Sequence, residues 1–209
     1  MDSGLVLDNV RITEGARTLL SVDAVIGPGQ IVTLMGESGA GKSTLLSCIM
    51  GHLPSIFRAS GRVLLDGVDL ADHAPEARRI GILYQDPLLF PHLDVAANLG
   101  FGLPRGGSRG ERRARVVAAL SDIGLDNFAD RDPATLSGGQ AARIALMRVL
   151  LSQPRALLLD EPFSKLDADR RDQMRRLVFD RARAAAIPVL MVTHDASDAA
   201  AADGPILRL

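Results

Sequence analysis

One short segment of the chain, GESGAGKST at residues 36–44, fits the pattern GxxxxGK(S/T). An apolar, strand-like run, QIVTLM, precedes it, and an apolar, helix-compatible run follows it over residues 45–50. Strand, glycine-rich loop and helix is the context in which this pattern forms a phosphate-binding P-loop. Average residue usage produces the pattern by chance in about one chain in a hundred of this length, so an ordinary glycine-rich turn is a poor explanation.

The glycines of this loop have no β-carbon, so the backbone can turn tightly and direct several N–H groups at one anion. The following helix adds the positive end of its dipole. We expect Lys42 to reach the β and γ phosphates of a nucleotide and the Ser43 hydroxyl to ligate Mg²⁺. The residues predicted to bind the nucleotide here are Gly36, Glu37, Ser38, Gly39, Ala40, Gly41, Lys42, Ser43 and Thr44.

Composition limits where the protein works. No run of 18 or more apolar residues occurs and no signal peptide is evident at the N-terminus, so we expect a cytoplasmic protein. The net charge of −1 offers no field that would attract nucleic acid, and the basic run at residues 105–115 is interpreted as a solvated loop. Cys48 is the only cysteine, which excludes an internal disulfide; it is predicted to be a small core residue.

Hydrophobic periodicity predicts an α/β chain. Strands are expected at residues 5–12 and 19–26, as an antiparallel pair, and at 30–35, 62–66, 80–84, 156–159 and 189–193, with a loop between Pro54 and Gly61. Helices are expected at residues 94–101, 111–123, 140–151, 168–186 and 196–202. The order predicts one domain over residues 1–209, with a mainly parallel core, an antiparallel start and a helical insertion at about 85–150.

Two acids end one of the buried strands, in the sequence ALLLDE at residues 156–161. Parallel α/β sheets place their ligands at the carboxyl ends of the strands. Asp160 suits ligation of Mg²⁺, and Glu161 suits polarisation of a water against the γ-phosphate. The alternative is a pair of acids that only ends a strand.

The sequence LSGGQ at residues 136–140 stands directly before a helix. Its glycines and the unpaired N–H groups of the helix start form a second phosphate-binding site. A helix start with a serine cap explains the loop alone, but not its occurrence beside a complete P-loop. One chain has no obvious second nucleotide for this site.

The order of GESGAGKST, Gln85, LSGGQ, ALLLDE, residues 164–167 and His194 resembles the nucleotide-binding subunits of ABC transporters. The resemblance covers essentially the whole chain, and LSGGQ is its most specific part. It implies a P-loop NTPase fold with an ABC-type ATPase core, an antiparallel β subdomain and a helical subdomain that carries the signature. It also implies ATP and Mg²⁺ as ligands and a head-to-tail dimer, in which each ATP lies between the P-loop of one subunit and the LSGGQ of the other.

The same resemblance implies roles for single residues. Gln85 is implied to contact Mg²⁺ and the attacking water, Glu161 to be the catalytic base, and Asp167 to link the two ATP sites. His194 is implied to contact the γ-phosphate and orient Glu161, although a lone histidine at a strand end is more often structural. The implied sets are catalytic Glu161, His194 and Lys42, metal-binding Ser43, Gln85 and Asp160, and ATP-binding Ser137, Gly138, Gly139, Gln140 and Asp167 in addition to the P-loop.

Two positions depart from the family pattern. The neighbourhood that carries an adenine-stacking aromatic residue in many relatives reads RITEG at residues 11–15, so base stacking is expected to be weak or to come from an aliphatic side chain such as Ile12. Lys165 stands where a small residue is usual, which places a cation near the expected dimer seam.

Residues 84–103 resemble the corresponding region of bacterial importers, and the segments ATLSGGQ at residues 134–140 and EPFSKLD at residues 161–167 look closest to thiamine-type and related small importer ATPases. This implies transmembrane permease subunits, whose coupling helix would dock at residues 87–91, and a periplasmic substrate-binding protein; a plain surface loop is the alternative. The location implied is peripheral, on the inner face of the membrane, with no nucleic acid partner. Other possibilities are an exporter or lipoprotein-release ATPase, a non-transport ABC ATPase acting on DNA or ribosomes, and a module without turnover.

Overall fold

The computed structural model describes residues 3–37 and 39–209, which divide into two compact units. The first unit comprises the chain up to Ile82 together with Arg155–Glu161 and Phe179–Leu209, and the second comprises Leu83–Pro154 and Pro162–Val178. The segment 85–150 lies within the second unit. In the part of the chain that the structure describes, no helix is both long enough and apolar enough to cross a membrane.

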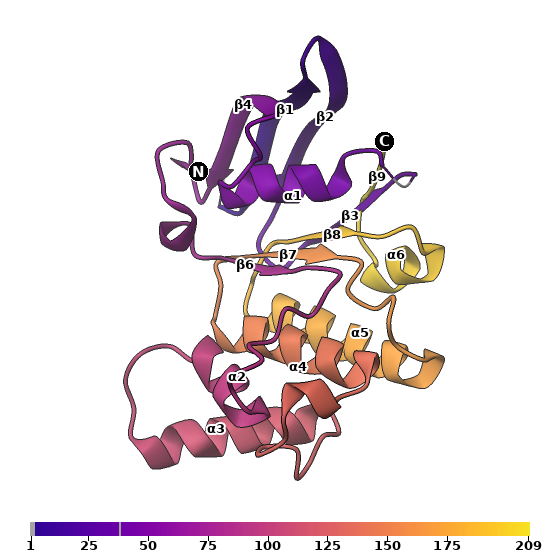
Figure 1. The fold of residues 1–209 in the computed structure, drawn as a ribbon. Coiled ribbons are helices and arrows are strands. Elements are labelled where there is room, and N and C mark those ends of the chain that lie inside the picture. Colours follow the sequence, from indigo (N-terminus) through magenta and orange to yellow (C-terminus); the bar gives the residue numbers. More distant parts are fainter. Residues whose placement is uncertain (1–2, 38) are drawn as a thin grey trace. The chain divides into compact units, whose positions relative to one another are not determined.

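An antiparallel sheet of the first unit has the strand order β2-β1-β4-β5 (Figure 1). Its strands are β1 (Leu5–Glu14), β2 (Arg17–Ile26), β4 (Phe57–Leu65) and β5 (Val68–Asp69). The apolar side chains of β1 alternate toward the core, where Leu5, Leu7 and Ile12 are fully buried. The predicted antiparallel pair at the start of the chain is confirmed.

The predicted loop between Pro54 and Gly61 is wrong, because β4 begins at Phe57. The segment is mostly exposed, yet from Phe57 on it pairs with β1, with Ala59 opposite Ile12. Gly61 lies at a bulge rather than at a loop end: its φ is 87°, and a β-carbon there would lie 2.3 Å from the Asn9 carbonyl oxygen. Pairing with a neighbouring strand thus overrides the weak local pattern.

The second sheet has the order β6-β7-β8-β3-β9. Its strands are β6 (Ile80–Leu83), β7 (Ala156–Asp160), β8 (Val189–Val192), β3 (Ile31–Met35) and β9 (Ile206–Arg208). The last four are parallel, and Val192 of β8 lies in register with Asp160 on one side and Leu34 on the other. The carboxyl ends of β3, β7 and β8 therefore align at one edge, where the P-loop, Glu161 and His194 follow them. The strand β9 was not predicted.

Helix α1 (Lys42–Met50) lies between the two sheets of the first unit (Figure 1). Its side chains Leu45, Leu46 and Ile49 are buried in a core that both sheets share. Helix α6 (Ala196–Ala202) packs against β3, and the short helix η1 covers Pro75–Ala77. Helix α5 (Ala168–Ala184) starts in the second unit and ends in the first.

The second unit contains α2 (Val95–Gly102), α3 (Arg109–Asp122), the short helix η2 (Pro133–Thr135) and α4 (Gly138–Leu151). Helix α2 packs against both α3 and α4. The approach of α2 to α4 is close, since a β-carbon at Gly102 would lie 2.2 Å from the Arg148 carbonyl oxygen. Ser108 and Glu111 cap α3 reciprocally.

Candidate functional site

The P-loop connects β3 to α1 in the first unit. Gly39 and Gly41 have φ values of 82° and 85°, a region that other residues rarely adopt. Gly41 also has no room for a side chain, since a β-carbon there would lie 2.7 Å from Leu19. Gly41 is the N-cap of helix α1, which has no side-chain cap and no acid in its first turn, so the N–H groups at the helix start suit an anion. The predicted ligand Ser38 lies outside the described residues.

Lys42 directly follows the P-loop, and its side chain folds back onto the backbone of that loop. Its side chain is 8% exposed, and Nζ donates to the carbonyl oxygens of Gly36 (2.8 Å) and Glu37 (2.7 Å). The ammonium group is thus held against the backbone of the loop that would receive a phosphate. A phosphate at this position would add an anionic partner to a cation already in place.

Asp160 at the end of β7 faces the start of α1. It is 7% exposed, burial raises the pKa of its carboxyl group, and the Ser43 hydroxyl, which donates to it, acts in the opposite direction. Mg²⁺ in nucleotide enzymes takes one or two protein oxygens and completes its shell with phosphate oxygens and water. Within residues 3–37 and 39–209, no group of three or more His, Cys, Asp or Glu could hold a metal by itself. Ser43 and Asp160 therefore fit a nucleotide-bound Mg²⁺.

Glu161 and His194 are brought together from the ends of neighbouring strands. The distance from His194 Nδ1 to Glu161 Oε1 is 2.8 Å, and the side chains are 67% and 19% exposed respectively. Glu161 adopts a left-handed conformation with φ 47°, and its N–H donates to the Val192 carbonyl oxygen over 2.9 Å. The backbone of the acid is thereby fixed to β8, the strand that leads to the histidine.

A hydrogen-bond network, which the sequence analysis did not predict, joins the residues on either side of His194 in the chain. The Thr193 hydroxyl donates to Asp198 Oδ2 over 3.1 Å and accepts from the Asp195 N–H over 3.1 Å. Asp195 in turn caps α6 by accepting from the Ser197 N–H. The available signal was an aspartate directly before a short helix, which is typical of an N-cap.

In the second unit the signature loop starts α4. The Ser137 hydroxyl accepts from the Gln140 N–H, and the Gln140 side chain accepts from the Ser137 N–H, so both polar side chains cap the helix. A β-carbon at Gly138 would meet no atom within 4 Å, whereas one at Gly139 would lie 3.2 Å from the Lys165 carbonyl oxygen. The first glycine thus leaves an open approach to the helix start, and the second is needed by a neighbouring loop.

The other predicted residues of the second unit are exposed. Gln85 follows β6, and Asp167 caps α5 by accepting from the Arg170 N–H over 3.0 Å. The first unit therefore gathers the P-loop, Asp160, Glu161 and His194, while the second carries Gln85, the signature and Asp167.

One expectation is wrong. Ile12 was expected to be available as an aliphatic surface for the adenine base, but its side chain is fully buried in the core of the first unit. Position 12 points to the core because residues alternate along β1, and its exposed neighbours on that strand are polar.

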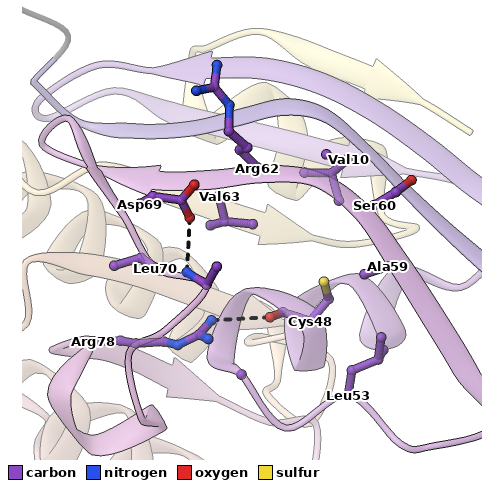
Figure 2. Close-up of a pocket in the computed structure, with 13 residues that line it drawn as sticks. Val10, Cys48, Leu53, Ala59, Ser60, Arg62, Val63, Asp69, Leu70 and Arg78 are labelled. Atoms are coloured by element: carbon purple, nitrogen blue, oxygen red, sulfur yellow. Dashed lines mark hydrogen bonds between the residues drawn. The ribbon is translucent and has the colours of Figure 1, made fainter.

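The first unit also has a cavity of about 330 Å³ at the C-terminal end of α1, away from the P-loop (Figure 2). Arg78 lines it and donates to the carbonyl oxygens of His73 (2.9 Å) and Ile49 (2.7 Å). Arg78 thus caps the helix that the P-loop begins. Cys48 lines the same cavity; it is half-buried rather than fully in the core, and burial raises the pKa of its thiol.

Comparison with known proteins agrees with this arrangement. Residues 19–164 match the ABC transporter family. The chain is 50% identical to the uncharacterized ABC transporter ATP-binding protein YnjD of Escherichia coli K12 over 202 residues, 96% of this chain and 92% of that protein. It is 43% identical to the thiamine import ATP-binding protein ThiQ of Jannaschia sp. CCS1 over 198 residues, 93% and 84% of the two chains.

A solved structure gives the same result for the fold. The dimeric post-hydrolysis state of the ATP-binding cassette MJ0796, bound to ADP and Pi, superposes with a TM-score of 0.85 at 31% identity, over 98% of this chain and 94% of that chain. The predicted family resemblance and the predicted P-loop NTPase fold are confirmed. The chain therefore belongs to the ABC transporter family, as an ATP-binding subunit with the fold of an ABC ATPase and ATP hydrolysis as its reaction.

Proposed function

We propose that the chain hydrolyses ATP in a head-to-tail dimer and thereby drives import of a small solute through partner membrane subunits. The observation that carries the proposal is the Glu161–His194 contact of 2.8 Å at the sheet edge where the P-loop begins. An acid that is mostly buried, beside an exposed histidine, suits a base that acts on a water while the histidine keeps its carboxylate oriented.

The mechanism assigns each residue a task. Lys42 and the N–H groups of the loop bind the β and γ phosphates, and Glu161 accepts a proton from the water that attacks the γ-phosphorus. The bond from the γ-phosphorus to the β–γ bridging oxygen breaks, and ADP and phosphate are the products. His194 orients Glu161 and contacts the γ-phosphate. Ser43 and Asp160 would hold Mg²⁺, which would neutralise negative charge on the phosphate oxygens.

The dimer explains the second phosphate-binding loop. The structure of MJ0796 named above is dimeric, and a second copy of this chain would bring its LSGGQ loop to the ATP held by the first. Ser137, Gly138, Gly139 and Gln140 would then act on the partner's nucleotide, and Asp167 would link the two sites. The open approach at Gly138 favours this assignment.

Import is supported by one relative and by one surface. The relative ThiQ is named as a thiamine import protein. In the second unit, Leu88 and Phe101 are 59% and 69% exposed, and Phe90 contacts Phe101 edge-on with ring centroids 4.7 Å apart. Exposed apolar side chains gathered in this way mark a protein contact.

The loop that carries this surface is held firmly. Asn98 is fully buried; its side-chain oxygen accepts from the Phe90 N–H, and its side-chain nitrogen donates to the carbonyl oxygens of Phe90, Leu93 and Asp94. Arg148 lies over the Phe90 ring and donates to the Leu88 carbonyl oxygen over 3.0 Å. A rigid apolar surface suits the coupling helix of a permease, so we place the protein on the inner face of the membrane, with a periplasmic binding protein delivering the solute.

The dimer is tested with Glu161→Gln, which keeps the size of the side chain and removes the base. With Mg²⁺ and ATP this variant should sediment as a dimer, and with ADP as a monomer. Glu76→Gln, an exposed glutamate of η1, is the matched control and should turn over ATP as the native chain does. If Glu161→Gln stays monomeric with ATP, the shared-site mechanism is wrong.

The transport part is tested by co-purification from the source organism with a tag on this chain. Recovery of a multi-span permease encoded beside a periplasmic binding protein would support import. Recovery of a permease that works without a binding protein would favour an exporter, and recovery of ribosomes or DNA-repair factors would overturn transport.

A further inference from the structure

Lys165 is the residue of the site that the proposed mechanism leaves without a task. It belongs to the second unit, between the acids that end β7 and the start of α5. Its Nζ lies 2.7 Å from Asp86 Oδ1, 79 positions earlier in the chain and directly after Gln85. The side chains are 35% and 79% exposed, so the ion pair is accessible to solvent and easily exchanged.

The backbone of the same residue makes a second contact. The Lys165 carbonyl oxygen is the atom that a β-carbon at Gly139 would approach to 3.2 Å, and the Leu166 side chain lies beside it at 3.5 Å. The loop at residues 162–167 therefore packs directly on the start of the signature helix α4. Asp167, two positions further on, is fixed to α5 by its bond to the Arg170 N–H.

The segment that holds Asp86 is itself attached to α4. Arg148, near the end of this helix, donates to the Leu88 carbonyl oxygen over 3.0 Å. Gly139 and Arg148 are nine positions apart, about 14 Å along the helix axis. Lys165 thus joins two segments that are both attached to α4: its carbonyl group contacts Gly139 at the start of the helix, and its ammonium group binds Asp86, two positions before the Leu88 carbonyl group that Arg148 holds.

We propose that Lys165 is a positioning residue: its ion pair with Asp86 and its backbone contact with Gly139 hold the loop at residues 162–167 in the arrangement that presents the signature and Asp167 to a second subunit. The effect on assembly rests on the proposed function, in which that subunit binds ATP jointly with the first. The pair is exposed, so it adjusts the loop without deciding the fold.

The test uses the Glu161→Gln background with Mg²⁺ and ATP. Lys165→Met and Asp86→Asn should each raise the dimer dissociation constant about twofold to fivefold, the range for an exposed ion pair. The double variant should be no weaker than either single variant, because both remove one interaction. The exchanged pair, Lys165→Asp with Asp86→Lys, should recover most of the affinity.

A second measurement examines the loop without the dimer. Amide hydrogen exchange of the nucleotide-free chain should become about twofold to fivefold faster at residues 164–167 in both single variants, with the melting temperature unchanged. Unchanged exchange, additive effects in the double variant, or no recovery in the exchanged pair would overturn the proposal. If Glu161→Gln itself does not dimerise, the proposed function fails, and the exchange rates alone still decide whether Lys165 holds the loop.

Discussion

Two buried threonines, one in the parallel sheet and one directly after its strand β8, should respond in opposite directions to the same substitution. Thr33 in the middle of β3 is fully buried, and its hydroxyl has no hydrogen-bond partner among the described residues. Thr193 is 1% exposed, but its hydroxyl bonds to Asp198 and to the Asp195 N–H. Valine has the shape of threonine with a methyl group in place of the hydroxyl, so each exchange removes one polar group and changes the volume of the side chain little.

The magnitudes follow from these partners. A buried hydroxyl without a partner costs about 1–3 kcal/mol, so Thr33→Val should raise the free energy of unfolding by about 1 kcal/mol. Thr193→Val leaves the carboxylate of Asp198, which is 2% exposed, with one hydrogen-bond donor fewer, and should lower the free energy of unfolding by about 1–3 kcal/mol. For a chain of this length, Thr33→Val should raise the melting temperature by about 3 °C.

The assay is urea unfolding of the nucleotide-free chain, monitored by circular dichroism. The free energies of unfolding of the variants and the native chain are compared where the dependence of this free energy on urea concentration has the same slope. Thr33→Ser is the control, because it keeps the hydroxyl and removes only the methyl group, and it should destabilise. Destabilisation by Thr33→Val would refute the reasoning, since it would mean that an internal water satisfies this hydroxyl.

Three further predictions concern the site. His194→Ala should lower the ATPase rate at least about 100-fold, while a fluorescent-nucleotide titration shows a far smaller loss of ATP affinity, since the histidine acts mainly through Glu161 and only secondarily through its contact with the γ-phosphate; an affinity loss as large as the rate loss would contradict this. Gly138→Ala should raise the melting temperature, because alanine favours helix, and yet abolish ATP-driven dimerisation. Gly139→Ala should not raise the melting temperature, and equal effects of the two substitutions would be evidence against separate roles of the two glycines. Asp160→Asn should stabilise the nucleotide-free chain at pH 7. Burial raises the pKa of Asp160, so the folded chain binds this proton more tightly than the unfolded chain does. The free energy of unfolding of the native chain therefore falls as the pH rises from 3.8, the ordinary pKa, through the raised pKa of the folded state. Urea unfolding should show that Asp160→Asn raises the free energy of unfolding at pH 7 and changes it little near pH 4; an increase of equal size at both pH values would refute the raised pKa as its cause.

The chemistry-bearing residues were predictable because they stand at ends of regular elements. β3, β7 and β8 are apolar throughout or nearly so, and runs of this length are typical of buried strands of a parallel sheet. Glycines, acids and a histidine directly after these strands must then meet at one edge. The contact between Glu161 and His194 follows from this alignment.

The residues that sequence reasoning missed are those whose position depends on pairing. The exposed start of β4 is bracketed by Pro54 and Gly61, which are typical of a loop, and it forms a strand because it pairs with β1. The three residues of β9 are too few to show periodicity and are placed by β3. Likewise, nothing near Lys165 in the sequence indicates Asp86, because the ion pair depends on how two distant loops fold back on α4.

The distribution of backbone constraints explains why this site suits a shared reaction. In the first unit the groups proposed to act on phosphate and water are fixed by the backbone: Lys42 by loop carbonyl groups and Glu161 by Val192. In the second unit the polar side chains of the signature are already used to cap α4, so what they leave for a ligand is the helix start itself at Gly138. A helix start binds an anion but cannot activate a water. In the proposed dimer, the signature of one copy would therefore complete the nucleotide site of its partner, and activation of the water would be left to Glu161 of that partner site.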